Sequence, residues 1–270
     1  MTDRNLPIGV FDSGVGGLTV VREIIRNLSN EKIVYFGDTA RVPYGNKSPE
    51  TVVRYSRQIA DFLVSQKVKA IVIACNTASA FALYDVKQAL DIPVIGVIEP
   101  GAETAVHATR NGRIGITGTT GTISSGLYEK YIKELMPEAV VTSKACPLFV
   151  NLVEEGMIDD PVTVMMIHRY LDEMIETSGI DTLVLGCTHY PLIRTVIGRE
   201  IGDGIRLVNP AYETALSLKS LLEEEGLSAN EGPATFDDHR FFVSDGIESF
   251  RKFAKDNLGF DIKNVELKTL

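Results

Sequence analysis

The chain of 270 residues has no tryptophan, only three cysteines, and fewer basic than acidic residues, 27 against 36. With a net charge of −9 and no long run of Lys and Arg, it lacks a basic surface for a phosphate backbone, so we expect no nucleic acid partner. No run of about 18 apolar residues occurs, which predicts no membrane partner. Cysteine and histidine spacings typical of a zinc site are also absent, and we expect no metal.

The compartment is predicted from the N-terminus and the cysteines. The first residues, MTDRNLP, have no apolar stretch after a basic start, so the sequence predicts an unexported, cytoplasmic protein. Three cysteines fit a reducing compartment better than a disulfide framework. At 44% hydrophobic residues, the chain can bury one large core or two moderate ones.

Two apolar runs each end in a cysteine: residues 69–75 read KAIVIAC and residues 181–187 read DTLVLGC. Such runs are too short for a helix and are typical of parallel strands buried on both faces. Ligands bind beyond the carboxyl ends of parallel strands. The sequence therefore predicts one site with Cys75 and Cys187 on opposite sides.

Strands and helices alternate along the chain. This predicts an α/β fold of two doubly wound parallel-sheet lobes, with the active site in the cleft between them. Residues 114–122 align with residues 8–16 without a gap, which indicates an internal repeat and pseudo-symmetric lobes. The C-terminal tail has no match in the other half and should pack on the first lobe. The predicted domains are residues 1–98 with 210–270, and residues 99–209.

Three local predictions concern turns and strand ends. Asp12 and Ser13 follow the first predicted strand beside a helix N-terminus, where an anion is favoured, although either side chain could simply cap that helix. Residues 37–45, with Pro and Gly, should form a loop without helix. Residues 93–98 should form a strand that ends at 99–101.

The two thiols indicate proton-transfer chemistry at a carbon atom. A pair on opposite sides of one carbon can remove a proton from one face and deliver one to the other, which is racemisation or epimerisation. A free Cys, with a pKa of about 8.5, needs only modest lowering to act as a base, and the helix N–H groups expected after each cysteine favour the thiolate. Cys146, beside Pro147, is interpreted as a small buried hydrophobe. No lysine lies in a pyridoxal context, so no cofactor is expected.

Six blocks of sequence resemble those of the glutamate racemases, in the aspartate/glutamate racemase superfamily. They occur in the family's order over nearly the whole chain: 11–17 (FDSGVGG), 37–45 (GDTARVPYG), 74–79 (ACNTAS), 118–122 (GTTGT), 146–150 (CPLFV) with 153–156 (VEEG), and 185–191 (LGCTHYP). The resemblance implies a cofactor-independent, two-base interconversion of L- and D-glutamate. It also implies that the product D-glutamate serves peptidoglycan and cell wall synthesis, and that the enzyme is usually a cytoplasmic homodimer.

The resemblance also implies roles for individual residues. Cys75 would take the α-proton from D-glutamate and Cys187 from L-glutamate, with Asp12 assisting Cys75, and Glu154 and His189 beside Cys187. The positions that match the family's substrate contacts are Asp12, Ser13, Tyr44, Gly45, Asn76, Thr77, Thr119, Thr122, Thr188 and His189. Asn151 stands where Pro is expected in the family, which leaves Glu155 open as an alternative to Glu154. Asp38 could be a turn former and is left out of the catalytic set.

Two other functions stay open. An aspartate or hydantoin racemase would use the same thiols, because pocket depth cannot be read from a sequence. A two-lobed solute-binding or regulatory protein has the same predicted architecture, but it needs no thiols on opposing strand ends. The cysteine pair therefore favours a racemase.

Overall fold

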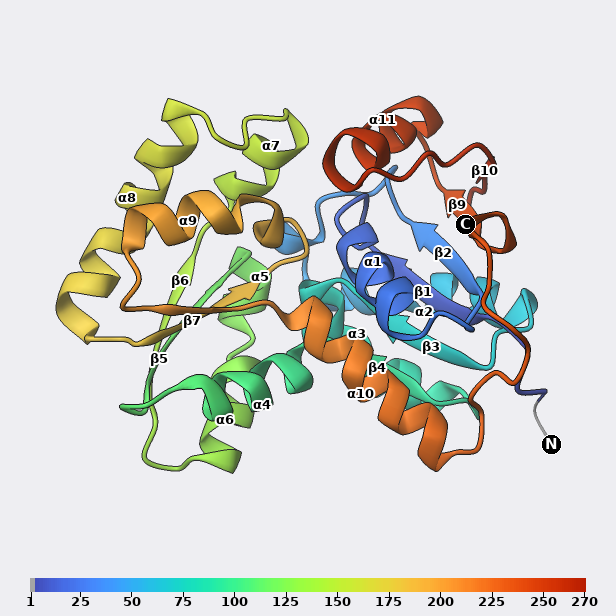
Figure 1. Ribbon diagram of the computed structural model, residues 1–270, viewed down its shortest axis with the longest axis horizontal. Helices are drawn as coiled ribbons and strands as arrows, with labels where there is room; N and C mark the ends of the chain where they lie inside the picture. Colours follow the sequence, from blue (N-terminus) through green and yellow to red (C-terminus); the bar gives the residue numbers. More distant parts are fainter. Residues whose placement is uncertain (1–2) are drawn as a thin grey trace.

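The computed structural model describes residues 3–270 and places them in two lobes, each built on a parallel sheet (Figure 1). The strands are β1 (Ile8–Asp12), β2 (Ile33–Gly37), β3 (Ala70–Ile73), β4 (Val94–Gly96), β5 (Arg113–Gly118), β6 (Val140–Ala145), β7 (Thr182–Gly186), β8 (Arg206–Val208), β9 (Arg240–Val243) and β10 (Val265–Leu267). The α-helices are α1 (Leu18–Asn27), α2 (Pro49–Ser65), α3 (Asn76–Ala89), α4 (Ile98–Ala108), α5 (Thr120–Ser124), α6 (Leu127–Leu135), α7 (Leu148–Glu154), α8 (Pro161–Ser178), α9 (Arg194–Ile201), α10 (Pro210–Glu224) and α11 (Ile247–Leu258). Short 3₁₀ helices cover Tyr44–Asn46 (η1), Tyr190–Ile193 (η2) and Phe236–Asp238 (η3).

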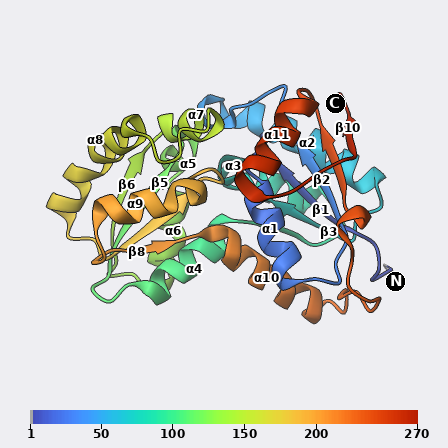
Figure 2. The same ribbon diagram turned by 45° about the horizontal axis from the view of Figure 1, so that its top comes forward.

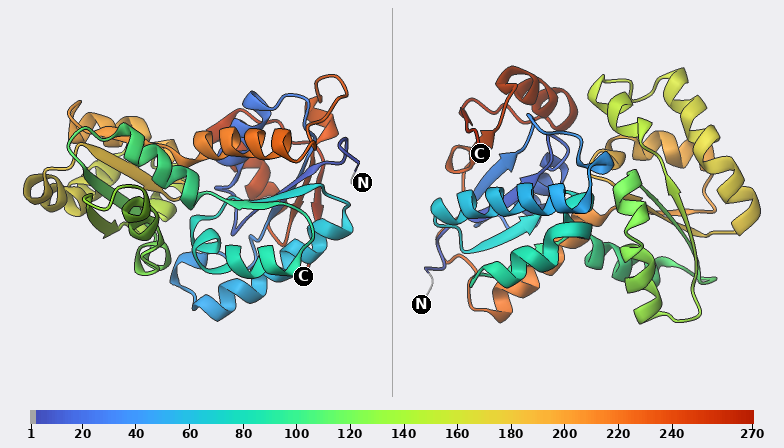
Figure 3. Two further views of the ribbon diagram at one scale, coloured as in Figure 1. Left: turned by 90° about the horizontal axis from the view of Figure 1, so that it is seen from below. Right: turned by 180° about the vertical axis from the view of Figure 1, so that it is seen from behind.

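The strands of the first lobe are buried on both faces. Every residue of β1, β2 and β3 is buried, as a parallel sheet with helices on both sides requires. Helices α2 and α3 lie side by side on one face of this sheet, and α1, α10 and α11 lie on the other (Figure 3). The predicted double winding is therefore confirmed.

The two sheets repeat one strand order. The first sheet runs β10-β9-β2-β1-β3-β4 and the second β6-β5-β7-β8, so in both lobes the first strand lies between the second and third, with the fourth at the edge. In this order β3 corresponds to β7, and these are the strands that precede Cys75 and Cys187. The predicted pseudo-symmetry of the lobes is confirmed at the level of topology.

The C-terminal segment extends the first sheet. Strand β9 pairs with β2, and β10 pairs with β9, both parallel (Figure 2). Helix α10 follows β8 directly and leads from the second lobe back to the first (Figure 1). The domain limits at 98/99 and 209/210 stay a prediction.

Two local predictions are wrong. Strand β4 ends at Gly96, and residues 98–101 begin α4 instead of ending a strand. Pro100 is compatible with this helix because it occupies the third helical position, where a backbone N–H has no partner within the helix. The loop over residues 37–45 is not free of helix, since η1 begins at Tyr44. Such a turn needs only one hydrogen bond, from the Lys47 N–H to the Tyr44 carbonyl at 3.0 Å.

A buried histidine at the start of β9 makes stability depend on pH. Its Nδ1 accepts the Ile33 N–H at 3.2 Å. Burial lowers the pKa of His239 below 6.5, although the negative charge of Asp238 raises it in part. Below pH 6.5 the unfolded chain thus binds more protons at this residue than the folded chain, so stability should fall as the pH drops. We expect the melting temperature to decrease, by about 2–4 °C per kcal/mol lost.

Thermal unfolding of the wild type and His239→Gln between pH 5 and 8 checks this expectation. The glutamine variant should show a shallower decrease below pH 6.5, because its side chain does not titrate. Parallel curves for the two proteins would contradict the role given to His239.

Candidate active site

The carboxyl ends of four strands meet between the lobes. Ser13 follows β1, Cys75 follows β3, Thr119 follows β5 and Cys187 follows β7. They enclose a cavity of about 20 Å³, room for about one water molecule. It is lined by Ser13, Val42, Pro43, Tyr44, Gly45, Cys75, Asn76, Thr77, Thr119, Val150, Cys187, Thr188 and His189. The two thiols predicted to share one site therefore line one cavity.

Hydroxyl groups from both lobes meet at one side of this cavity. Thr77 Oγ1 of the first lobe lies 2.8 Å from Thr119 Oγ1 and 3.2 Å from Thr122 Oγ1 of the second. Among the lining residues there is no Lys or Arg. Apart from His189, the groups available to hold a bound carboxylate are thus hydroxyl, amide and backbone donors.

Cys75 caps the N-terminus of α3. Its sulfur accepts the Ala78 N–H at 3.4 Å, and its thiol donates to Ser13 Oγ at 3.7 Å. Burial raises the pKa of Cys75 to about 12, and the nearby Asp12 carboxylate also raises it, whereas the Ala78 and Ser13 hydrogen bonds lower it. The helix N–H group thus lowers the pKa of Cys75 as expected, but burial outweighs it, and Cys75 is a neutral thiol at pH 7.

Cys187 faces a histidine. His189 Nδ1 lies 3.8 Å from the Cys187 sulfur, and His189 Nε2 lies 2.9 Å from Glu154 Oε1. Burial lowers the pKa of His189, but its hydrogen bonds to Cys187 and Glu154 outweigh this and raise the pKa to about 10. An imidazolium therefore stands beside the Cys187 sulfur and stabilises negative charge there. Of the two carboxylates left open by the sequence, Glu154 is the one that contacts His189.

Asp12 connects the turn after β1 with the residue that follows Cys187. Its Oδ2 accepts the Gly14 N–H at 3.0 Å, and its Oδ1 accepts the Thr188 hydroxyl at 3.4 Å. Full burial raises its pKa. Asp12, Thr122 and Glu154 do not line the cavity themselves, but each contacts a residue that does. All other predicted site residues line it directly.

Some residues at the site were not predicted. Val42, Pro43 and Val150 line the cavity, although all three fall within the blocks quoted for the family resemblance. Tyr128 donates its hydroxyl proton to Asn76 Oδ1 at 2.8 Å, and no sequence pattern indicated this contact. Asp38 accepts hydrogen bonds from Tyr44 and Arg41 and so supports the loop that carries Tyr44.

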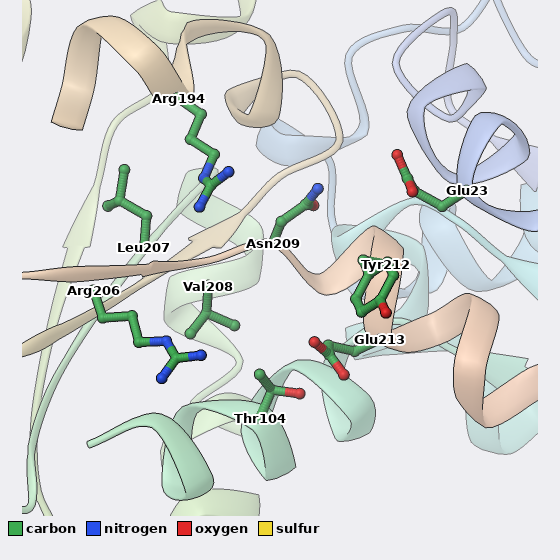
Figure 4. Close-up of a pocket in the computed structure, with 9 residues that line it drawn as sticks. All are labelled: Glu23, Thr104, Arg194, Arg206, Leu207, Val208, Asn209, Tyr212 and Glu213. Carbon is green, nitrogen blue, oxygen red and sulfur yellow. The ribbon is translucent and has the colours of Figure 1, made fainter. Parts of the chain in front are cut away.

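Other features lie apart from the thiols. Cys146 is fully buried, its thiol donates to the Lys144 carbonyl at 3.6 Å, and it does not line the cavity. A larger pocket of about 400 Å³ lies where β8 leads into α10, with the side chains of Arg194, Arg206 and Glu213 around it (Figure 4).

Within residues 3–270, no cluster of three or more His, Cys, Asp or Glu side chains is arranged to hold a metal ion. No helix in the same range is long and apolar enough to cross a bilayer.

Comparison with known proteins identifies the family. Residues 8–217 match the family model described as Asp/Glu/Hydantoin racemase. The chain belongs to this family. It is 52% identical over 261 residues to the glutamate racemase of Geobacter metallireducens, which covers 96% of this chain and 94% of the relative. The family resemblance of the six blocks is thereby confirmed.

Solved racemase structures share the fold. Glutamate racemase RacE1 of Bacillus anthracis has a TM-score of 0.94 and 42% identity, covering 99% of this chain and 98% of that one. The glutamate racemase of Francisella tularensis, solved in complex with D-glutamate, has a TM-score of 0.90 and 38% identity, with 98% of both chains covered. This racemase therefore has the two-lobed parallel-sheet fold of glutamate racemases.

Proposed function

We propose that this enzyme interconverts L- and D-glutamate by two-base proton transfer between Cys75 and Cys187. The observation that carries the proposal is that both thiols line one closed cavity from corresponding strand ends of the two lobes. The choice of glutamate is supported by the 52% identity to the Geobacter metallireducens enzyme and by the D-glutamate complex of the Francisella tularensis relative.

The conversion of L-glutamate begins at Cys187. Acting as the base beside the His189 imidazolium, which Glu154 holds by a hydrogen bond, the Cys187 sulfur takes the α-proton, so a C–H bond breaks and an S–H bond forms. The electron pair stays on the α-carbon and spreads into the α-carboxylate. Cys75, a neutral thiol because burial raises its pKa to about 12, then delivers its proton to the opposite face. D-glutamate reacts by the reverse sequence.

The closed cavity has two roles in this mechanism. With room for about one water molecule, it cannot admit an amino acid, so the lobes must separate for entry and close again around the substrate. Closure excludes water, which strengthens the hydrogen bonds from the hydroxyl and amide groups to the substrate carboxylates. We further propose that the enzyme is a cytoplasmic homodimer that supplies D-glutamate for peptidoglycan, as the resemblance of the six blocks implies.

The function is tested by following the circular dichroism of L- and D-glutamate separately with purified enzyme free of pyridoxal phosphate. Either enantiomer should converge on an equal mixture. Aspartate, the control, should react about 10- to 200-fold more slowly, the usual effect of one missing methylene. Conversion of aspartate alone would contradict the proposed substrate while leaving the two-thiol chemistry in place.

A further inference from the structure

Tyr128 and Asn76 form a buried hydrogen bond across the lobes. Tyr128 lies on α6 of the second lobe, and Asn76 is the first residue of α3, directly after Cys75. The phenol donates to Asn76 Oδ1 at 2.8 Å, and both residues are at least 96% buried, with exposures of 3% and 4%. Asn76 also lines the cavity between the thiols.

The Tyr128 ring has no room to turn away. It packs in a cluster with Ile98, Ile132 and Val208. Its edge also lies so close to Gly101 and Gly186 that a Cβ at either glycine would be only 3.2 or 3.1 Å from a ring carbon. The phenol is therefore fixed beside the end of β7, one residue before Cys187.

This contact determines which way the Asn76 amide points. Within residues 3–270 the Tyr128 hydroxyl has no other hydrogen-bond partner, so its buried proton must go to Asn76 Oδ1. With its oxygen occupied, the amide offers the Nδ2–H₂ group, which makes no hydrogen bond of its own in the same range. A carboxylate, which only accepts hydrogen bonds, needs a donor in this position.

We infer that Tyr128 is a positioning residue for substrate binding: it holds the Asn76 amide so that Nδ2–H₂, and not Oδ1, faces a carboxylate of the bound amino acid. The inference rests on the proposed function for its substrate. Without the phenol, the amide can turn its oxygen toward the carboxylate, and the two acceptors then repel each other.

Tyr128→Phe removes only the hydroxyl and tests the inference. Because the inference gives Asn76 a role in substrate binding and not in proton transfer, KM for both enantiomers should rise about 5- to 10-fold with little change in kcat. In an Asn76→Ala background the same substitution should cause no further rise in KM, as expected for two residues that act as one unit. Tyr131→Phe, three residues along α6, is the matched control and should have the wild-type KM, because the Tyr131 hydroxyl makes no hydrogen bond within the described residues.

Asn76→Asp provides a second variant that does not depend on changing Tyr128. It keeps an acceptor for the phenol but replaces the donor group, and KM should rise by at least as much as in Asn76→Ala. A wild-type KM in Tyr128→Phe or Asn76→Asp, or equal effects of Tyr128→Phe with and without Asn76, would overturn the inference. If the wild type instead racemises aspartate alone, the proposed substrate fails, and the same KM comparison on aspartate still tests Tyr128.

Discussion

Cys187→Ala should abolish racemisation, with a loss of about 10²- to 10⁴-fold or more in kcat. The variant lacks one of the two proposed acid/base groups, but Cys75 still lines the cavity. In D₂O its remaining reaction should be exchange of the α-proton of D-glutamate for deuterium without inversion, and this exchange should be slow because burial keeps Cys75 mostly a neutral thiol. Cys75→Ala should show the reciprocal behaviour and exchange only L-glutamate.

The wild-type enzyme should show an isotope pattern that matches this two-base scheme. Since the proton removed by one thiol is not the proton delivered by the other, product formed in D₂O should carry deuterium from the first turnover, and unreacted substrate should stay protiated early. Mass spectrometry measures the deuterium content, and circular dichroism of the same samples measures the extent of racemisation. Cys146→Ala is the control, because Cys146 does not line the cavity, and should keep most of the activity. Product that retains its own hydrogen, or a Cys187→Ala enzyme near the wild-type rate, would show that a single base does the work.

Gly16→Ala should lower kcat by about 100-fold or more, although residue 16 carries no reactive group. A Cβ at this position would lie 2.6 Å from the His189 ring and closer still to Thr188 Oγ1. Real Cβ atoms do not approach so closely, so both side chains on the Cys187 side must shift. They have little freedom to do so, because Thr19 Oγ1 bonds the carbonyls of both Gly16 and Thr188, at 2.9 and 3.0 Å.

Gly204→Ala is the matched control for this substitution, because a Cβ there meets no atom within 4 Å. Steady-state kinetics of both variants, with far-ultraviolet circular dichroism to verify folding, separates an active-site effect from unfolding. A Gly16→Ala enzyme that folds and turns over at the wild-type rate would contradict the tight contact between this turn and His189.

The sequence was sufficient where one local pattern determined the structure. The apolar runs before Cys75 and Cys187 are strands β3 and β7, as predicted. The start of α10 also follows from a local signal, because Pro210 is the first helical residue and Asn209 caps the helix by accepting the Ala211 N–H at 3.1 Å.

Prediction failed where the cause was not local. Strand β10 has only three residues, and its pairing with β9 is fixed by tertiary packing. The pKa of Cys75 depends first on burial, which the helix start at residue 76 does not reveal. Tyr128 contacts Asn76 from 52 residues away in the chain, so no periodicity connects them. The motifs thus indicated most of the residues that line the cavity, whereas the Tyr128 contact and the raised pKa of Cys75 could not be read from them.

The matching strand orders of the two sheets correspond to a symmetry in the free energies of the reaction. Mirror-image substrates have equal free energies, so the equilibrium constant is one, and whatever kcat/KM the enzyme reaches in one direction it must also reach in the other. A deprotonated α-carbon is nearly planar, so protonation of either face is almost the same chemical step. In the proposed mechanism the ends of β3 and β7 each bring a thiol to one of these faces, so the same kind of group acts in both directions of a reaction that has no preferred direction.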